Sequence, residues 1–72
     1  MKYAVVIERG PTTFGATVPD LPGCFAVGET REEVERLIQE AVAEHLALLR
    51  AQGLPIPEPR SSTTEVEINR AR

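Results

Sequence analysis

The stretch Val18–Thr30, VPDLPGCFAVGET, contains two prolines, two glycines and the only cysteine of the chain. Pro22 and Gly23 fit the central pair of a type II turn, because glycine readily adopts the positive φ that the second central position requires. The apolar run Cys24–Val27 then predicts a short strand. The stretch therefore predicts a turn, a strand and a helix start in direct succession.

A long helix is predicted after this stretch. The sequence TREE from Thr30 is a capping box, in which the Thr30 hydroxyl accepts from the Glu33 amide and the Glu33 carboxylate reaches back to the Thr30 amide. Glu32 and Arg36 have the favourable i,i+4 order for an ion pair. Gly53 suits the position after the helix end. The predicted helix spans 31–52, and its apolar residues recur with the helical period: Val34, Leu37, Ile38, Ala41, Val42, Leu46 and Leu49.

Two strands are predicted before the stretch. Lys2–Glu8 is rich in β-formers and apolar on both alternating sides, which is typical of a central strand covered on both faces. After the turn segment RGPTT, Phe14–Val18 alternates and predicts the second strand of a hairpin. Gly15 in mid-strand indicates a bulge or a close approach of another group.

The segment after the helix completes the predicted fold. Leu54–Arg60 alternates proline with other residues and is expected to be extended. Glu65–Asn69 alternates apolar and acidic residues and predicts a fourth strand, followed by a frayed end at 70–72. The expected class is α+β with the order β-β-β-α-β. A right-handed crossover gives a four-stranded mixed sheet of order 3-2-1-4, with one helix on one face.

The size of the chain predicts self-association. Its 72 residues allow a single domain, 1–72, which buries only about 60% of the surface that the unfolded chain exposes. Cys24 cannot form an internal disulfide, and one cysteine with one histidine cannot complete a four-ligand zinc site. One helix covers one sheet face, and the first strand offers apolar side chains on the other. We therefore expect a homo-oligomer, a dimer or tetramer, or another partner on the open face.

Composition argues against several classes of partner. The net charge is −3 and no basic cluster occurs, which argues against direct nucleic-acid binding. No apolar stretch of membrane-spanning length is present, and the apolar run near the N-terminus is too short for a signal peptide. A lone thiol suits the reducing cytoplasm, which is the expected location.

Two groups of residues are candidate catalytic sites. Glu8, Asp20 and Glu29 could meet at strand ends and hold Mg²⁺, but charged residues beside Gly or Pro in turns are routine. Cys24 and His45 could form a thiolate–imidazole pair, but a buried small hydrophobe and a helix-edge histidine explain them as well. Phosphate-binding glycine motifs are absent, and the three aromatic residues fall in predicted strands. The chain is therefore predicted to be non-enzymatic, with no catalytic residue, metal or cofactor.

Nearly the whole chain resembles the N-terminal domain of the HicB antitoxins, in particular the short HicB-like proteins that consist of this domain alone. The residues that carry the likeness are Tyr3 with the apolar run to Glu8, the run Phe14–Cys24, Gly28–Thr30 with Glu33, Glu40–Ala41, His45–Leu46 and Gly53–Pro57. The resemblance implies a partial RNase H-like layer with a degraded active site.

The resemblance also implies a function. In this family the domain binds and blocks HicA, a small basic toxin that cleaves mRNA, and it tends to self-associate. A C-terminal DNA-binding module, present in many members, is not expected in this sequence. The leading hypothesis is therefore a non-enzymatic antitoxin that neutralises a HicA-type toxin. The alternatives are a stand-alone oligomeric domain with another regulatory role and a remnant of a metal-dependent nuclease. The predicted partner-binding residues are those of the turn, with nearby exposed parts of strands two and three: Asp20, Leu21, Pro22 and Gly23.

Overall fold

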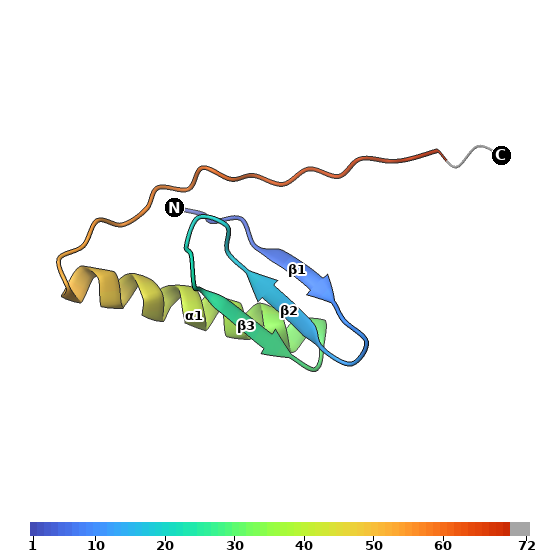
Figure 1. Cartoon of the computed structure of the whole chain (residues 1–72), viewed down its shortest axis with the longest axis horizontal. Helices are drawn as coiled ribbons and strands as arrows, with labels where there is room; N and C mark the ends of the chain where they lie inside the picture. The colour runs from blue at the N-terminus through green and yellow to red at the C-terminus, as the bar shows by residue number, and fades with distance from the viewer. Residues whose placement is uncertain (70–72) are drawn as a thin grey trace.

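A computed structural model describes residues 1–69 as a small sheet covered by one helix (Figure 1). Strands β1 (Val6–Arg9), β2 (Phe14–Thr17) and β3 (Phe25–Gly28) precede helix α1 (Arg31–Ala51). The three strands form an antiparallel sheet in the order β1-β2-β3. Helix α1 packs against β2 and β3 on one face of this sheet.

The strand register determines which residues face the helix. Ala16 at the centre of β2 pairs with Ile7 of β1 and Ala26 of β3, and this row lies on the helix side of the sheet. Ala16 is buried, and its two partners are half-buried. Because side chains alternate along a strand, the neighbouring residues Thr17 and Phe25 point to the opposite face.

The connection from β2 to β3 confirms the predicted turn. Gly23 has a φ of 84°, and the Cys24 amide donates to the Leu21 carbonyl at 3.0 Å, which closes a turn with Pro22 and Gly23 at its centre. A second turn lies directly before it, since the Leu21 amide donates to the Val18 carbonyl at 3.0 Å. The two successive turns direct the Leu21 side chain into the core, where it is completely buried.

The N-terminus of α1 confirms half of the predicted capping box. The Thr30 hydroxyl accepts from the Glu33 amide at 3.0 Å. The Glu33 carboxylate, however, accepts from the amide of Glu29 at 2.6 Å, one residue before the predicted donor. The return bond therefore also fixes the strand-to-helix connection.

The rest of α1 follows the prediction closely. The helix ends at Ala51 with Gln52 as its C-cap, and Gly53 follows with a φ of 70°, as expected for a helix-terminating glycine. Arg36 pairs with Glu40 at 3.4 Å, so the predicted partner of Arg36 on the preceding turn was wrong.

The core lies between the first half of α1 and the β2–β3 part of the sheet. Leu21 and Val34 are completely buried at its centre, and the loop between β2 and β3 supplies more of the buried hydrophobic residues than the strands do. The half-buried side chains around it come from the N-terminal segment, from all three strands and from the later turns of the helix. The buried hydrophobic residues are Ala16, Val18, Leu21, Cys24, Val34 and Ile38.

The predicted fourth strand and the sheet order 3-2-1-4 were wrong. Residues 54–69 form neither helix nor strand, so the described fold is β-β-β-α with a three-stranded antiparallel sheet. Strand β1 lies at the edge of the sheet rather than at its centre, and Val6 on its outer side is 40% exposed. The predicted frayed end, residues 70–72, lies outside the described residues.

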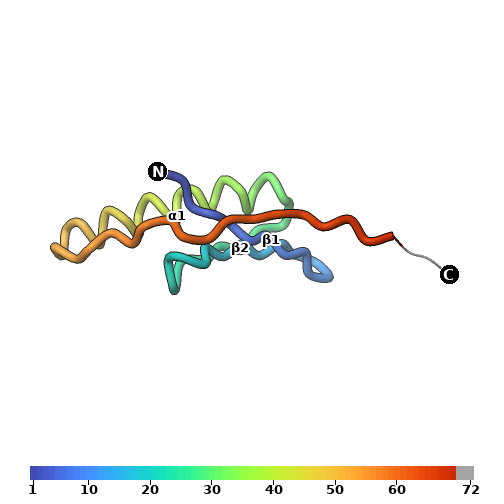
Figure 2. The backbone as a smooth tube through the Cα atoms, turned by 90° about the horizontal axis from the view of Figure 1, so that it is seen from above, coloured from blue at the N-terminus to red at the C-terminus, as the bar shows by residue number. Residues whose placement is uncertain are grey.

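The fourth strand does not form because residues 54–69, which we call the tail, are hydrogen-bonded to Tyr3 and Asp20. Three prolines keep this segment extended and remove backbone donors. The Tyr3 hydroxyl donates to the Pro57 carbonyl, and the Asp20 carboxylate accepts from the amides of Arg60 and Ser61, both at 2.8 Å. Both views show the tail passing the sheet and continuing beyond it (Figure 1, Figure 2).

Candidate protein-binding surfaces

The face of the sheet opposite α1 carries exposed apolar side chains. Phe25 and Val27 of β3 are 65% and 56% exposed, and Val6 of β1 is 40% exposed. The register places Thr17 between Val6 and Phe25, and Gly15 beside Val27. We call these five residues the open sheet face. A Cβ added at Gly15 would meet nothing within 4 Å, so the surface is open above that glycine, and no bulge occurs in β2.

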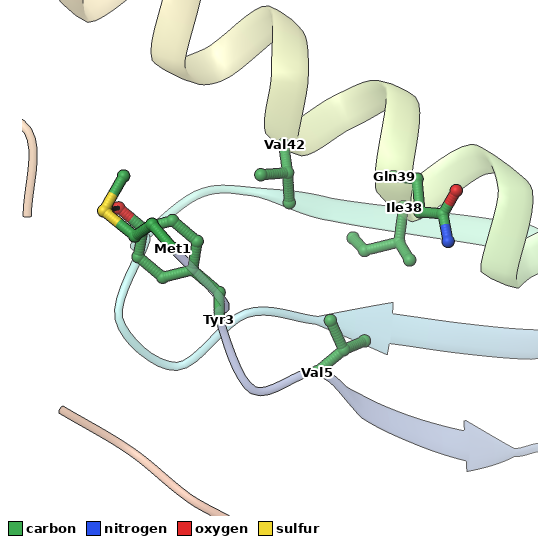
Figure 3. A pocket seen from close by; sticks show the side chains of 6 residues that line it. All are labelled: Met1, Tyr3, Val5, Ile38, Gln39 and Val42. Carbon is green, nitrogen blue, oxygen red and sulfur yellow. Dashed lines mark hydrogen bonds between the residues drawn. The ribbon is translucent and has the colours of Figure 1, made fainter. Parts of the chain in front are cut away.

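A groove runs along the other side of β1, between that strand and α1. One hollow of about 290 Å³ is lined by Tyr3 and Val5 from the N-terminal segment and by residues of α1 (Figure 3). A second hollow of about 220 Å³ extends it toward Ile7. The two hollows share Val5, Ile38 and Gln39, so we treat them as one, the β1–α1 groove. Its full lining is Met1, Tyr3, Val5, Ile7, Glu35, Ile38, Gln39 and Val42.

A third hollow lies at the outer edge of β3 and brings Cys24 and His45 together. It has a volume of about 220 Å³ and is also lined by Phe25, Glu44 and Leu48. Cys24 is buried, and burial raises the pKa of its thiol. A catalytic cysteine needs a lowered pKa, because the thiolate is the nucleophile. The geometry therefore favours a packing role for Cys24 over a thiolate–imidazole pair.

Of the three acidic residues that form the candidate metal site, Asp20 bonds to the segment after α1. Asp20 accepts hydrogen bonds from the Arg60 and Ser61 amides and from the Ser61 hydroxyl at 3.0 Å. These bonds lower the pKa of Asp20, the Ser61 amide contributing most. Within residues 1–69, no three His, Cys, Asp or Glu side chains lie close enough together to hold a metal ion. The bonds of Asp20 therefore join the β2–β3 loop to a segment distant in sequence.

The four predicted partner-binding residues have different environments. Leu21 is completely buried and offers its side chain no outside contact. Asp20 is occupied by the tail, whereas Pro22 and Gly23 are exposed at the tip of the turn. A role for Pro22 and Gly23 in partner binding stays a prediction. The alternation of β3 is the sequence signal that could have singled out Phe25 and Val27, since their neighbour Ala26 faces the helix.

In the part of the chain that the structure describes, no helix combines the length and the apolar character needed to cross a lipid bilayer. Three of the exposed large apolar side chains, those of Val6, Phe25 and Val27, lie together on the open sheet face. Exposed apolar patches are typical of surfaces that contact other proteins.

Known proteins with similar sequences span nearly the whole chain. A protein of Thermoplasma acidophilum described as UPF0150 protein Ta0767 is 33% identical over 96% of this chain and 99% of its own length. An uncharacterized 14.9 kDa protein of Haemophilus phage HP1 is 32% identical over 96% of this chain but only 50% of its own length. A UPF0150 protein of Helicobacter pylori is 36% identical over 86% of each chain.

A solved structure and a family model both match this chain to HicB-type antitoxins. The solved structure is described as a HicA3 and HicB3 toxin-antitoxin complex, and one of its chains matches this fold with a TM-score of 0.71 and 32% identity. The match covers 83% of this chain and 70% of that chain. Residues 3–70 match the family described as HicB_like antitoxin of bacterial toxin-antitoxin system. The chain therefore belongs to the HicB-like antitoxin family, as the resemblance in its sequence predicted.

Proposed function

We propose that this chain is a non-enzymatic antitoxin that binds and neutralises a small, basic, mRNA-cleaving toxin of the HicA type in the cytoplasm. Membership of the HicB-like antitoxin family supports this role, as does the 32% identity to a chain of a solved HicA3–HicB3 complex. The observation that carries the proposal is the open sheet face, which leaves large apolar side chains of a very small domain in contact with water.

We propose the open sheet face as the surface that contacts the toxin. Phe25 and Val27 project from the same strand, on the face that α1 leaves uncovered. Binding energy at protein interfaces concentrates in a few apolar or aromatic anchors that become fully desolvated, within a polar rim. Glu8 lies across from Gly15 in the register and supplies an acidic group at this rim.

The charge of the chain suits a basic partner. The formal net charge is −3, with 11 acidic and 8 basic side chains. Charge of opposite sign raises the association rate and favours the correct partner, while burial of the apolar anchors supplies most of the affinity. Neutralisation then requires only that the bound chain cover the toxin's RNA-binding surface. The antitoxin needs no reactive group of its own for this effect.

Co-expression with a small basic HicA-type protein encoded beside this gene tests the proposal. We expect the two chains to co-purify, and we expect the toxin to lose its ability to cleave single-stranded RNA when this chain is added. Phe25→Ser should weaken the complex, whereas Leu54→Ser should not, since Leu54 is 49% exposed but lies beyond the helix. A toxin that cleaves RNA at full rate with an excess of the folded chain would contradict the proposal and favour the stand-alone oligomeric domain.

A further inference from the structure

We propose that an extended segment of the toxin pairs as a strand with the outer edge of β3, placing an apolar side chain in the hollow between β3 and α1 and a lysine or arginine beside Glu44. This inference rests on the proposed antitoxin function and specifies a second way in which the toxin is held, in addition to the apolar contact on the open sheet face. The edge and the face use different groups of this chain, so variants can separate the two contacts.

The outer edge of β3 presents backbone groups that another strand can bind. Within residues 1–69, β3 pairs only with β2. At the end of this ladder the Val18 amide donates to the Cys24 carbonyl at 3.4 Å. Because hydrogen-bonded and non-hydrogen-bonded pairs alternate along an antiparallel ladder, the backbone groups of Phe25 and Val27 point away from β2. An extended segment of a second protein can pair with these groups.

The hollow beside this edge can receive a side chain of the added strand. It lies between the start of β3 and the second half of α1 and has a volume of about 220 Å³. A strand at the β3 edge would direct every second side chain toward the helix side of the sheet. There an apolar side chain would meet Cys24, Ala41 and Leu48. Leu48 is 56% exposed, so the contact would remove a large apolar side chain from water.

The charge at the hollow indicates the chemistry of the segment that binds there. Glu44 lines the hollow and is exposed. Among residues 1–69, the ion pairs of α1 are Arg31–Glu35 and Arg36–Glu40, and Glu44 takes part in neither. The chain has a net charge of −3, and the proposed toxin is basic. A carboxylate beside an apolar hollow suits a lysine or arginine, whose aliphatic stem covers apolar surface while its charged end reaches the carboxylate.

The position of the open sheet face favours the β3 edge over the β1 edge. Phe25 belongs to that face and also lines the hollow, so the two contacts are continuous with each other. The segment before β1, in contrast, is bonded to the tail, because the Tyr3 hydroxyl donates to the Pro57 carbonyl. The tail passes along the β1 side of the sheet (Figure 1). One toxin molecule can therefore contact the face and the outer edge of β3 together.

Hydrogen exchange in the complex tests the strand pairing. We expect exchange at the Phe25 and Val27 amides to slow at least about tenfold when purified HicA-type toxin is added to the full chain. The Ile7 amide is the matched control, because the same alternation directs the Ala16 backbone groups to β3 and the Ile7 amide to the outer edge of β1. Exchange at Ile7 should not change. Protection at Ile7 alone, or at neither edge of the sheet, would overturn the proposal.

Matched variants test the hollow and the charge beside it. Leu48→Ser should lower the affinity for the toxin at least about fivefold, whereas Leu54→Ser, at a side chain of similar exposure, should not. Glu44→Lys should lower the affinity more than Glu58→Lys, which makes the same change in net charge on the tail. The difference between the two lysine variants should shrink as the salt concentration rises. Circular dichroism checks that each variant is folded.

Calorimetry with Val27→Ser separates this inference from the proposed function. Val27 lies on the open sheet face and is not among the residues that line the hollow, so its variant reports on the face alone. If Val27→Ser weakens binding while Leu48→Ser and Glu44→Lys bind the toxin like the parent chain, the edge strand is contradicted and the antitoxin function stands. If the parent chain does not bind the toxin, both proposals fail.

Discussion

The Asp20 carboxylate accepts hydrogen bonds from both the amide and the hydroxyl of Ser61, 41 positions later in the chain, at 2.8 and 3.0 Å. A loop that precedes β3 therefore fixes the course of the tail that follows α1. Because a carboxylate that accepts several hydrogen bonds stays ionised more readily, this contact is also sensitive to pH.

Replacing Asp20 should release the tail without unfolding the domain. Asp20→Ala removes the acceptors for the Arg60 and Ser61 amides, and the buried core contains neither partner. We expect hydrogen exchange at these two amides to accelerate several-fold while exchange in α1 is unchanged. Glu29→Gln, which alters another acidic residue beside a turn, serves as the control. Equal protection of both amides in Asp20→Ala would show that the carboxylate does not hold the tail.

Acidification should release the tail of the unmodified chain. The hydrogen bonds lower the pKa of Asp20 below its ordinary value of 3.8, so the ionised form is favoured when the tail is bound. A lowered pKa means that the contact is complete above 3.8 and is lost as the pH falls through the lowered value. Chemical shifts of the Arg60 and Ser61 amides should therefore titrate with a midpoint below 3.8. A midpoint at or above the ordinary value would contradict this assignment.

Leu21 should be essential for stability rather than for binding. Its side chain is completely buried, so Leu21→Ala should lower the free energy of unfolding by about 2–5 kcal/mol. Leu48, which is 56% exposed, provides the matched control, and Leu48→Ala should cost less than about 1 kcal/mol. Urea unfolding followed by circular dichroism measures both values. Similar losses for the two variants would place Leu21 outside the core.

The Thr30 cap should stabilise the start of α1. Thr30→Ala removes the acceptor for the Glu33 amide and should cost about 1 kcal/mol. Thr30→Ser keeps the hydroxyl and should retain most of that stability. Thermal unfolding of the three proteins gives the comparison, and an alanine variant as stable as the serine variant would argue against the cap.

Local features of the fold were predictable from the sequence because neighbouring residues determine them. The Pro22-Gly23 turn, the cap at Thr30 and the helix end before Gly53 each depend on short-range bonds and backbone conformation. The family was also predictable, since the motifs that carry it are contiguous in the chain. Alternation in β3 likewise contained the information that Phe25 lies on an exposed face.

Features that depend on distant contacts were not predictable in this way. The alternation in residues 65–69 indicates a strand but does not say which edge, or which chain, it pairs with. Its position depends on Asp20, which lies 40 residues before Arg60. The same limit explains why Leu21 was assigned to the partner surface. A turn motif fixes the backbone, and only the two successive turns of the folded loop show that this side chain points inward.

Titration of a purified HicA-type toxin with the folded chain, followed by calorimetry, tests the central claim most directly. We predict tight binding by the parent chain and by Leu54→Ser, and a loss of at least about tenfold in affinity for Phe25→Ser, since Phe25 is the most exposed apolar residue of the open sheet face. Equal affinity for all three proteins would show that the toxin binds elsewhere. Failure of the parent chain to bind would contradict the antitoxin role itself.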